Sequence, residues 1–356
     1  MKTLRLSVDP AHLDHAESRG TIAQAADILR HGGLVAFPTE TVYGLGANAL
    51  DAVAVGRIFE AKQRPDWDPV IVHIAGPAAE NPMLQNLVSE IPSRAQALIA
   101  NFWPGPLTLL LPRTNAVPDA VTAGRPLVGI RMPAHSVAFE LIRQAGVPIA
   151  APSANVFGHI SPTTAAHVRE DLDGRIDAIL DAGPTEHGVE STVLDPNQDP
   201  MMIYRPGAIT AQQICEIAGP VDYFQSSIQA HAATCEALPS PGVGLRHYAP
   251  RARLILVDAP LAALPGRIGE EAGRHATERL GFLLPVEISA LELIASHPTA
   301  TVSPWGHWSA PDELARNLYA CLRALDSRGC TLIICALPPA DGLGAAIRDR
   351  LCKAAH

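Results

Sequence analysis

Two cations, Lys62 and Arg64, stand two positions apart where Pro65 must end a helix. On a helix their side chains would diverge, but the extended backbone that a proline favours in the residue before it lets both point to one side. Lysine as a point charge and arginine as a bidentate donor suit phosphate oxygens. Positive charge at a helix C-terminus is also favourable by itself. Lys62 is the only lysine away from the chain ends, which hold Lys2 and Lys353, and this favours a phosphate site.

Polar side chains also follow two apolar segments that read as buried strands. The sequence PTETVYGLG, residues 38–46, follows the first, and Ser153 and Asn155 follow the second. Ligands in α/β sheets bind outside the carboxyl ends of strands, where glycines let backbone amides come close to a ligand. A hydroxyl and an amide together can hold a phosphate or a ribose. Ordinary polar turns after strands have the same composition, so these segments alone leave both interpretations open.

Arg131 ends the apolar segment LVGIR. An arginine that emerges from a buried strand needs an anionic partner, and a carboxylate of the protein or of a substrate would serve equally. His73 lies in the apolar segment VIVHIA, where a histidine is more often a core residue than a ligand. The segments HGVEST (187–192) and YRPG (204–207) place further polar residues at strand ends.

Several classes of catalytic site have no signature in this sequence. It contains no G-x-x-x-x-G-K-[ST], no H-E-x-x-H, no cysteine and histidine cluster with zinc spacing, and no G-x-S-x-G. The remaining inventory is one of cations, hydroxyls and glycine loops without an obvious nucleophile. It predicts binding of phosphates and a small anion, with catalysis by positioning and charge neutralisation.

The elements that must position these residues alternate between helix and strand patterns. We predict a first domain over residues 1–218, with helices at 22–31 (capped by Thr21), 51–61 (capped by Asp51), 93–102, 136–145, 164–172 and 211–218. Its predicted strands are 34–37, 70–75, 107–111, 127–131, 147–151, 176–181, 191–195 and 201–204. Because several strands follow each other without a helix, the pattern predicts a mixed α/β sheet.

The last third of the chain has a different pattern. Residues 219–250 are rich in proline and small residues and predict an interdomain linker. Residues 251–356 predict a second, smaller α/β domain, with strands at 253–258, 281–285 and 331–335 and helices at 311–325 and 343–354.

Composition excludes some functions. The chain has 356 residues, 47% of them hydrophobic, which is enough for two cores and excludes global disorder. Its net charge of −9 argues against nucleic-acid binding by bulk charge. The N-terminal residues lack the apolar region of a secretory signal, and no segment is a membrane span, so we expect a cytoplasmic protein. The six cysteines form no C-x-x-C pair and are expected to be free thiols.

Taken together, these motifs resemble the YrdC-like family in its two-domain form, the threonylcarbamoyl-AMP synthases. The resemblance covers nearly the whole chain. Its motifs are GGLVAFPTETVYGLGANA (32–49), AKQRP (61–65), VIVHIA (70–75), WPGPLTLLL (103–111), GIRMP (129–133), APSAN (151–155), GVEST (188–192), RPGAI (205–209), SPGVGLRHYAP (240–250) and GLGAAIRDRLCKAA (342–355). It implies a twisted mixed sheet with helices in the first domain and a smaller, Rossmann-like second domain.

The resemblance also implies an activity. The enzyme would make threonylcarbamoyl-AMP and pyrophosphate from L-threonine, bicarbonate and ATP, with Mg²⁺ bound through the ATP phosphates rather than by protein ligands. The amine of threonine would capture bicarbonate as a carbamate, which attacks the α-phosphorus of ATP. That reaction needs positive charge more than a strong base. The product would pass to a separate threonylcarbamoyl transferase that modifies an adenosine beside the tRNA anticodon, and no stable tRNA binding by this chain is implied.

Particular residues carry over from the family. It implies Lys62 and Arg64 as catalytic residues and the following set around ATP: Lys62, Arg64, Ser153, Asn155, Arg205, His247 and Tyr248. Threonine would be held by Thr39, His73, Arg131 and Ser191. Residues 219–250 would form a lid. Gly244 and Leu245 stand where the family commonly has a lysine and an aromatic residue, which leaves contacts from Arg246, His247 and Tyr248.

Two other functions compete with this interpretation. One is a double-stranded RNA-binding module, because YrdC-like domains present a concave positive surface; the net charge and the scarcity of lysine weigh against it. The other is a different carbamoyl-adenylate enzyme such as a hydrogenase maturation factor, whose acylphosphatase and zinc-finger segments this chain lacks.

Overall fold

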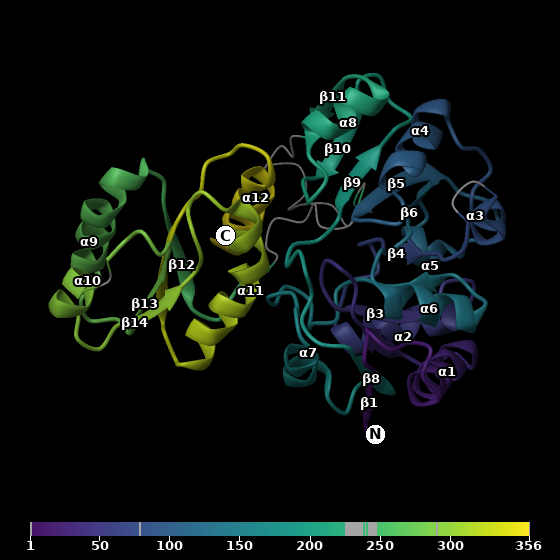
Figure 1. Ribbon diagram of the computed structural model, residues 1–356, viewed down its shortest axis with the longest axis horizontal. Coiled ribbons are helices and arrows are strands. Elements are labelled where there is room, and N and C mark those ends of the chain that lie inside the picture. Colours follow the sequence, from purple (N-terminus) through teal and green to yellow (C-terminus); the bar gives the residue numbers. More distant parts are fainter. Residues whose placement is uncertain are drawn as a thin grey trace. The chain divides into compact units, whose positions relative to one another are not determined.

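The computed structural model describes residues 2–77, 80–224, 238, 240, 248–289 and 291–355 (Figure 1). The chain divides into two compact units. Unit 1 contains residues 1–157, 161–186 and 190–244, and unit 2 contains residues 158–160, 187–189 and 245–356. Two short segments of the predicted first domain, 158–160 and 187–189, therefore belong to unit 2. Each unit has its own sheet and its own apolar core.

An eleven-stranded sheet runs through unit 1 in the order β1-β8-β2-β3-β7-β4-β6-β5-β9-β10-β11. Its strands are β1 (Leu4–Ser7), β2 (Val35–Phe37), β3 (Gly44–Asn48), β4 (Ile71–His73), β5 (Leu107–Pro112), β6 (Leu127–Arg131), β7 (Ile149–Ala150), β8 (Ala178–Asp181), β9 (Thr192–Asp195), β10 (Met201–Arg205) and β11 (Val221–Tyr223). Parallel pairs such as β4 with β6 lie beside antiparallel pairs such as β5 with β6. The predicted mixed sheet is confirmed.

Alternate residues of each strand point to opposite faces of this sheet, so helices can pack on either face. The helices of unit 1 are α1 (Ala16–Arg30), α2 (Ala52–Lys62), α3 (Pro82–Leu87), α4 (Ser93–Phe102), α5 (Asp119–Thr122), α6 (Ser136–Ala145), α7 (Ala165–Leu172) and α8 (Ala211–Ala218). Val35 and Phe37 of β2 belong to one core with α1 and α6, whereas Ala36 belongs to a second core with α2 and α4. The apolar segment at 34–37 therefore contributes side chains to the apolar cores on both faces of the sheet.

Helix boundaries show where local signals succeed and fail. The predicted cap at Asp51 is confirmed, because its Oδ1 accepts hydrogen bonds from the amides of Val53 and Ala54 at 2.9 and 3.2 Å. The predicted start at Ile22, with Thr21 as its cap, is wrong, because α1 begins six residues earlier at Ala16 and passes through Gly20. A glycine inside a helix costs about 1 kcal/mol relative to alanine. Burial of the apolar stripe of α1, such as Ile22, outweighs that cost.

The PTETVYGLG segment contains a strand that the sequence did not predict. Its last three residues, 44–46, begin β3, which pairs antiparallel with β2. A side chain at Gly46 would place its Cβ 2.8 Å from both Phe37 and Ile149, so this strand position accepts only glycine. Residues 38–43 form the tight connection between the two strands.

The sheet of unit 1 extends beyond the predicted domain end. The composition predicted a linker from residue 219, but Val221–Tyr223 forms β11, which pairs parallel with β10. Most of the predicted linker after Phe224 lies outside the described residues.

Unit 2 is a smaller α/β fold with a four-stranded parallel sheet in the order β12-β15-β13-β14. Its elements are β12 (Arg253–Val257), the 3₁₀ turn η1 (Leu261–Ala263), α9 (Leu264–Arg274), β13 (Leu280–Leu284), α10 (Leu291–Ser296), β14 (Thr301–Pro304), α11 (Pro311–Ser327), β15 (Leu332–Ala336) and α12 (Leu343–Ala355). The second α/β domain is confirmed.

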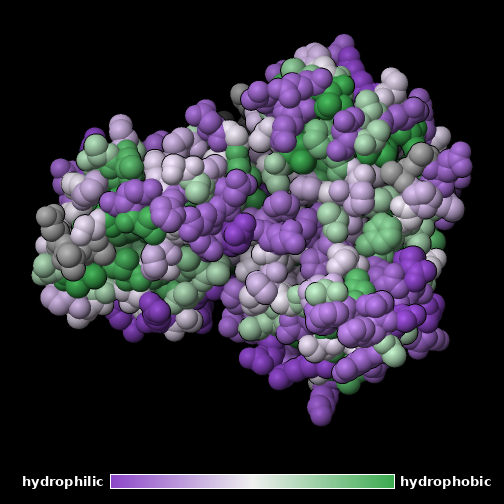
Figure 2. All heavy atoms as spheres, viewed as in Figure 1, coloured by the Kyte–Doolittle hydropathy of each residue, from purple (hydrophilic) through white to green (hydrophobic). Residues whose placement is uncertain are grey.

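Hydrophilic residues cover much of the face seen in Figure 2, and hydrophobic residues show between them. Within the described parts of the chain, no helix has the length and apolar character needed to cross a membrane.

Candidate functional site

Five neighbouring strands of unit 1 bring polar residues to one edge of the sheet. Strands β4, β6 and β10 end there, and β5 and β9, which lie between β6 and β10, begin there. His73 ends β4, directly opposite Arg131, which ends β6. Arg205 ends β10, and Ser191 precedes β9. The sheet therefore assembles residues that are far apart in the sequence, as expected for strand ends.

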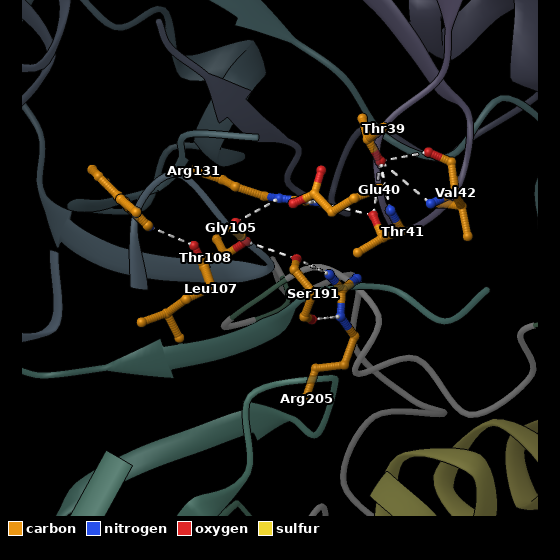
Figure 3. A network of polar contacts seen from close by, with 11 residues as sticks. Thr39, Glu40, Thr41, Val42, Gly105, Leu107, Thr108, Arg131, Ser191 and Arg205 are labelled. Atoms are coloured by element: carbon orange, nitrogen blue, oxygen red, sulfur yellow. Dashed lines mark hydrogen bonds and ion pairs between the residues drawn. The ribbon is translucent and has the colours of Figure 1, made fainter. Parts of the chain in front are cut away.

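Arg131 is buried and makes an ion pair with Glu40. Its Nη2 lies 2.7 Å from Glu40 Oε1, and both side chains are less than 5% exposed. Its Nη1 donates to Thr41 Oγ1 at 2.9 Å and its Nε to the carbonyl of Gly105 at 3.3 Å (Figure 3). Of the two partners that the sequence allowed for this arginine, the structure shows a carboxylate of the protein.

The threonines beside Glu40 fix the loop that carries it. Thr39 Oγ1 donates to the carbonyl of Val42 at 2.7 Å and lies 2.8 Å from Thr41 Oγ1 (Figure 3). It also accepts hydrogen bonds from the amides of Thr41 and Val42. These buried bonds hold the connection between β2 and β3 in one conformation, with Glu40 turned toward Arg131.

His73 is fully enclosed beside this pair. Burial and the positive charge of Arg131 lower the pKa of His73 to about 3, so its ring is neutral at physiological pH. Its ring packs edge-on against Phe37 with centroids 6.2 Å apart. His73 Nδ1 has no hydrogen-bond partner in the described residues, so it is a buried polar atom in need of one.

Ser191 joins a second set of contacts on the neighbouring strands. Its Oγ lies 2.8 Å from Thr108 Oγ1 of β5 and accepts a hydrogen bond from Arg205 Nη2 at 3.0 Å (Figure 3). Arg205 Nε donates to the carbonyl of Ser191 at 3.0 Å. A Cβ on Gly207 would lie 2.3 Å from the amide nitrogen of Thr192, so the segment RPG can pack here only with glycine.

Lys62 lies at the end of α2 and reaches the segment after β7. It is 1% exposed, and its Nζ donates to the carbonyls of Ser153 and Asn155, both at 2.5 Å. Burial and the charge of Arg64 lower the pKa of Lys62 well below its usual value. The helix ends through Gln63 in the left-handed conformation, φ 53°.

Arg64 is fixed by the segment that follows it. Its Nη2 pairs with Asp68 Oδ1 at 2.9 Å and donates to the carbonyl of Pro69 at 2.7 Å. Its guanidinium also lies over the Phe157 ring, 5.8 Å from the centroid. Burial raises the pKa of Asp68 although the positive charges of Arg64, Lys62 and Arg205 all act to lower it. Three cations therefore act on one buried carboxylate.

The structure thus brings most of the predicted site residues into two adjacent clusters of unit 1. We define the cation cluster as Lys62, Arg64, Asp68, Ser153, Asn155 and Arg205. We define the carboxylate cluster as Thr39, Glu40, Thr41, His73, Arg131 and Ser191. The Ser191–Arg205 contact and the effect of Arg205 on Asp68 connect the two.

Two predicted ATP residues are not part of these clusters. Tyr248 lies in unit 2, where its ring stacks on Tyr319 with centroids 5.9 Å apart and Arg350 lies over it at 5.2 Å. His247 lies outside the described residues. Their predicted contact with ATP stays a prediction.

Two carboxylates of the clusters, Glu40 and Asp68, were not predicted as site residues from the sequence. Glu40 follows the predicted Thr39 directly and Asp68 lies four residues after the predicted Arg64, and the two are 2% and 1% exposed in the structure. The need of Arg131 for an anion was the available signal for Glu40. It could not select this partner, because ninety residues separate Thr41 of the same loop from Arg131.

Buried cations and a paired arginine and glutamate are the kinds of group that bind anionic and zwitterionic ligands. Comparison with known proteins gives a family. Residues 27–207 match the Sua5, YciO and YrdC family model described as "Telomere recombination", and residues 209–356 match the one described as "Threonylcarbamoyl-AMP synthase, C-terminal domain". The chain therefore belongs to the threonylcarbamoyl-AMP synthase family in its two-domain form, a family of nucleotidyl-transferring enzymes.

Similar proteins agree over the whole length. A threonylcarbamoyl-AMP synthase of Bacillus subtilis is 43% identical over 100% of this chain and 98% of its own length. One of Pyrococcus abyssi is 42% identical over 93% of this chain and 92% of its own. The crystal structure of P. abyssi Sua5 complexed with L-threonine is 40% identical, with a TM-score of 0.89, and covers 99% of this chain and 98% of that one.

Proposed function

We propose that this chain catalyses the synthesis of threonylcarbamoyl-AMP and pyrophosphate from L-threonine, bicarbonate and ATP. The proposal rests on one observation: two buried clusters of different charge lie next to each other at one edge of the sheet. Three cations act on the carboxylate of Asp68 in the cation cluster, whereas arginine and glutamate balance each other in the carboxylate cluster. An excess of positive charge suits phosphates, and a balanced pair suits the zwitterion of an amino acid.

In this proposal the cation cluster binds ATP. Lys62 and Arg64 contact the phosphates, with Arg205 beside them, and Ser153 and Asn155 hold the nucleotide. Lys62 is already placed by two carbonyls and Arg64 by Asp68, so little rearrangement is needed when the ligand arrives. Such prearranged charge lowers the barrier for attack at phosphorus, because it meets the negative charge that develops on the leaving group.

The carboxylate cluster binds threonine in this proposal. Arg131 takes the α-carboxylate by a bidentate contact, and the hydroxyl groups of Thr39 and Ser191 and the ring of His73 belong to the same cluster. A pocket that hydrogen-bonds a substrate hydroxyl discriminates strongly against analogues that lack it, because its buried polar groups would be left unpaired. Valine should therefore be a far poorer substrate than threonine.

Mg²⁺ would enter this site bound to ATP. No group of three or more histidine, cysteine, aspartate or glutamate side chains in the described residues is arranged to hold a metal ion, and the cation cluster suits phosphates. When bound, Mg²⁺ neutralises charge on the phosphate oxygens. We expect the product to pass to a separate transferase acting on tRNA, without stable tRNA binding by this chain and in the cytoplasm.

The test is pyrophosphate release from ATP and Mg²⁺, with threonine and bicarbonate omitted in turn. Dependence on both supports carbamate formation followed by adenylation. Release with threonine alone, after bicarbonate has been stripped, would indicate direct activation of the amino acid. No release in any mixture would contradict the proposal, and RNA binding with a measured salt dependence would then be the next assay.

A further inference from the structure

The carboxylate cluster contains buried polar atoms that the described residues do not satisfy. Apart from Arg131 and the amides of Ala134 and of Glu40 itself, the two carboxylate oxygens of Glu40 have no partner among the described residues, and neither do His73 Nδ1 and His135 Nδ1. These atoms come from three elements: the connection after β2, strand β4 and the N-cap of α6. Buried polar groups without partners at a site indicate a missing polar ligand.

Glu40 is the one carboxylate in this group. The groups that face it are Arg131 from β6, His73 from β4, and the Ala134 amide and His135 at the start of α6. Burial lowers the pKa of both histidines, so the rings are neutral and Arg131 is the full positive charge in contact with Glu40 in the described structure. A substrate carboxylate that takes Arg131 would therefore compete directly with Glu40.

We propose that Glu40 is the proton acceptor for the α-ammonium group of the amino-acid substrate. The inference rests on the proposed function, which places the substrate carboxylate on Arg131. Once that carboxylate displaces Glu40, the freed side chain lies beside the substrate and can take a proton from its ammonium group. The freed amine then has the lone pair that attack on bicarbonate requires.

The step balances as follows. The substrate ammonium gives one proton to the Glu40 carboxylate, which becomes a carboxylic acid, and a neutral amine remains. The nitrogen lone pair forms the C–N bond to the bicarbonate carbon, and a C–O bond breaks. The departing hydroxide takes a second proton from nitrogen and leaves as water, which yields the carbamate. Glu40 returns its proton to solvent before the next turnover.

The charges in the site make Glu40 an effective base only when the substrate is bound. Arg131 holds the pKa of Glu40 below its usual value, although burial acts to raise it. A bound substrate carboxylate neutralises Arg131, so burial then dominates and the pKa of Glu40 rises toward the range of a useful base. His73 cannot take this role, because its pKa of about 3 makes it a far weaker base.

The first experiment is the pH profile of pyrophosphate release by Glu40→Gln, with saturating bicarbonate and carbonic anhydrase present. Loss of a general base should reduce the rate about 10²- to 10⁴-fold at pH 7. The variant should recover about tenfold per pH unit as solvent deprotonates the amine, whereas the wild-type rate should change little. Asp177→Asn is the matched control, because Asp177 pairs with Arg57 at 3.0 Å outside both clusters, and it should keep the wild-type rate and profile.

The second experiment separates proton transfer from simple positioning of Arg131. In the reverse direction, threonylcarbamoyl-AMP and pyrophosphate form ATP without any proton leaving an ammonium group. Glu40→Gln should therefore form ATP in a single turnover within about threefold of the wild-type rate. Glu40→Asp, which withdraws the carboxylate by about 1.5 Å, covers the case in which Glu40→Gln fails to fold. It should lose forward rate more than reverse rate.

Three outcomes would overturn the inference. The first is wild-type forward rate at pH 7 in folded Glu40→Gln. The second is equal loss of the forward and reverse rates, which would make Glu40 a positioning residue only. The third is failure of the wild-type enzyme in both directions. That third result contradicts the proposed function itself and is thereby distinguishable from the first two.

Discussion

Replacing Arg131 with methionine should destabilise unit 1 and reverse the pH response of Glu40. Methionine keeps much of the side-chain length but removes the ion pair to Glu40 and the hydrogen bonds to Thr41 and Gly105. The remaining carboxylate is 2% exposed and would lie in the protein without a counter-charge. Breaking a buried ion pair in this way costs about 3–5 kcal/mol.

The sign of the pH effect follows from Glu40. In the wild type its pKa lies below the ordinary 4.5, so Glu40 contributes stability above that pH and loses it as pH falls through the lowered pKa. In the Arg131→Met variant only burial remains as a large influence, and the pKa rises above 4.5. Between pH 4.5 and pH 7.5, the buried carboxylate then lowers the variant's free energy of unfolding least at pH 4.5. The loss of stability grows as the pH rises. The difference between the two proteins should therefore widen from pH 4.5 to pH 7.5.

Hydrogen exchange of peptides from β6 measures this difference within unit 1 alone, after correction for the intrinsic exchange rate at each pH. Arg94→Met is the control, because Arg94 pairs with an exposed Asp199 at 3.2 Å and its loss should cost no more than about 1 kcal/mol. Two results would contradict this prediction. One is a free energy of opening of β6 that Arg131→Met lowers by less than about 1 kcal/mol at pH 7.5, and the other is an equal loss at both pH values.

Four further outcomes are expected. Lys62→Met should abolish pyrophosphate release without changing the circular dichroism spectrum, because the phosphates of ATP would lose this cation. EDTA should stop turnover of the wild type, and added Mg²⁺ should restore it. Gly207→Ala should prevent correct folding of unit 1, seen as loss of soluble protein, because its Cβ would clash with Thr192. Phe37→Ala should lower the melting temperature through a cavity cost of about 3–5 kcal/mol, and an unchanged melting point would contradict the packing of β2.

The sequence predicted the mixed sheet and most of its strands because apolar runs bounded by glycine and proline report local burial. It failed where a local signal points away from the final packing. Gly44 and Gly46 are typical of a loop, yet both lie in β3. At position 46 the strand needs a glycine, because the side chains of Phe37 and Ile149 occupy the space that a Cβ would need. Such a requirement depends on strands that are distant in sequence, and local propensity does not contain it.

The same limit applies to the site. The motif around Lys62 and the segment around Ser153 were predicted to act together, and the structure joins them through the lysine Nζ. That contact is made by the carbonyl of Ser153, and the predicted contact of its hydroxyl with a nucleotide stays a prediction. Glu40 directly follows Thr39, which was predicted to bind the substrate, and yet Glu40 itself was not predicted as a site residue. The apolar pattern around Arg131 shows that the arginine needs an anionic partner, but it does not show which carboxylate that partner is.

The pairing of β1 with β8 has a consequence for synthesis of the chain on the ribosome. Leu4 pairs with Ala178, and Thr3 donates to the carbonyl of Ile176, 173 residues away. At about 5–20 residues per second, the N-terminal strand waits about 10–35 s before its partner has been made. During that time its backbone donors and acceptors are open to other strands. Its brevity and its exposed Arg5 are features that discourage such pairing before β8 has been made.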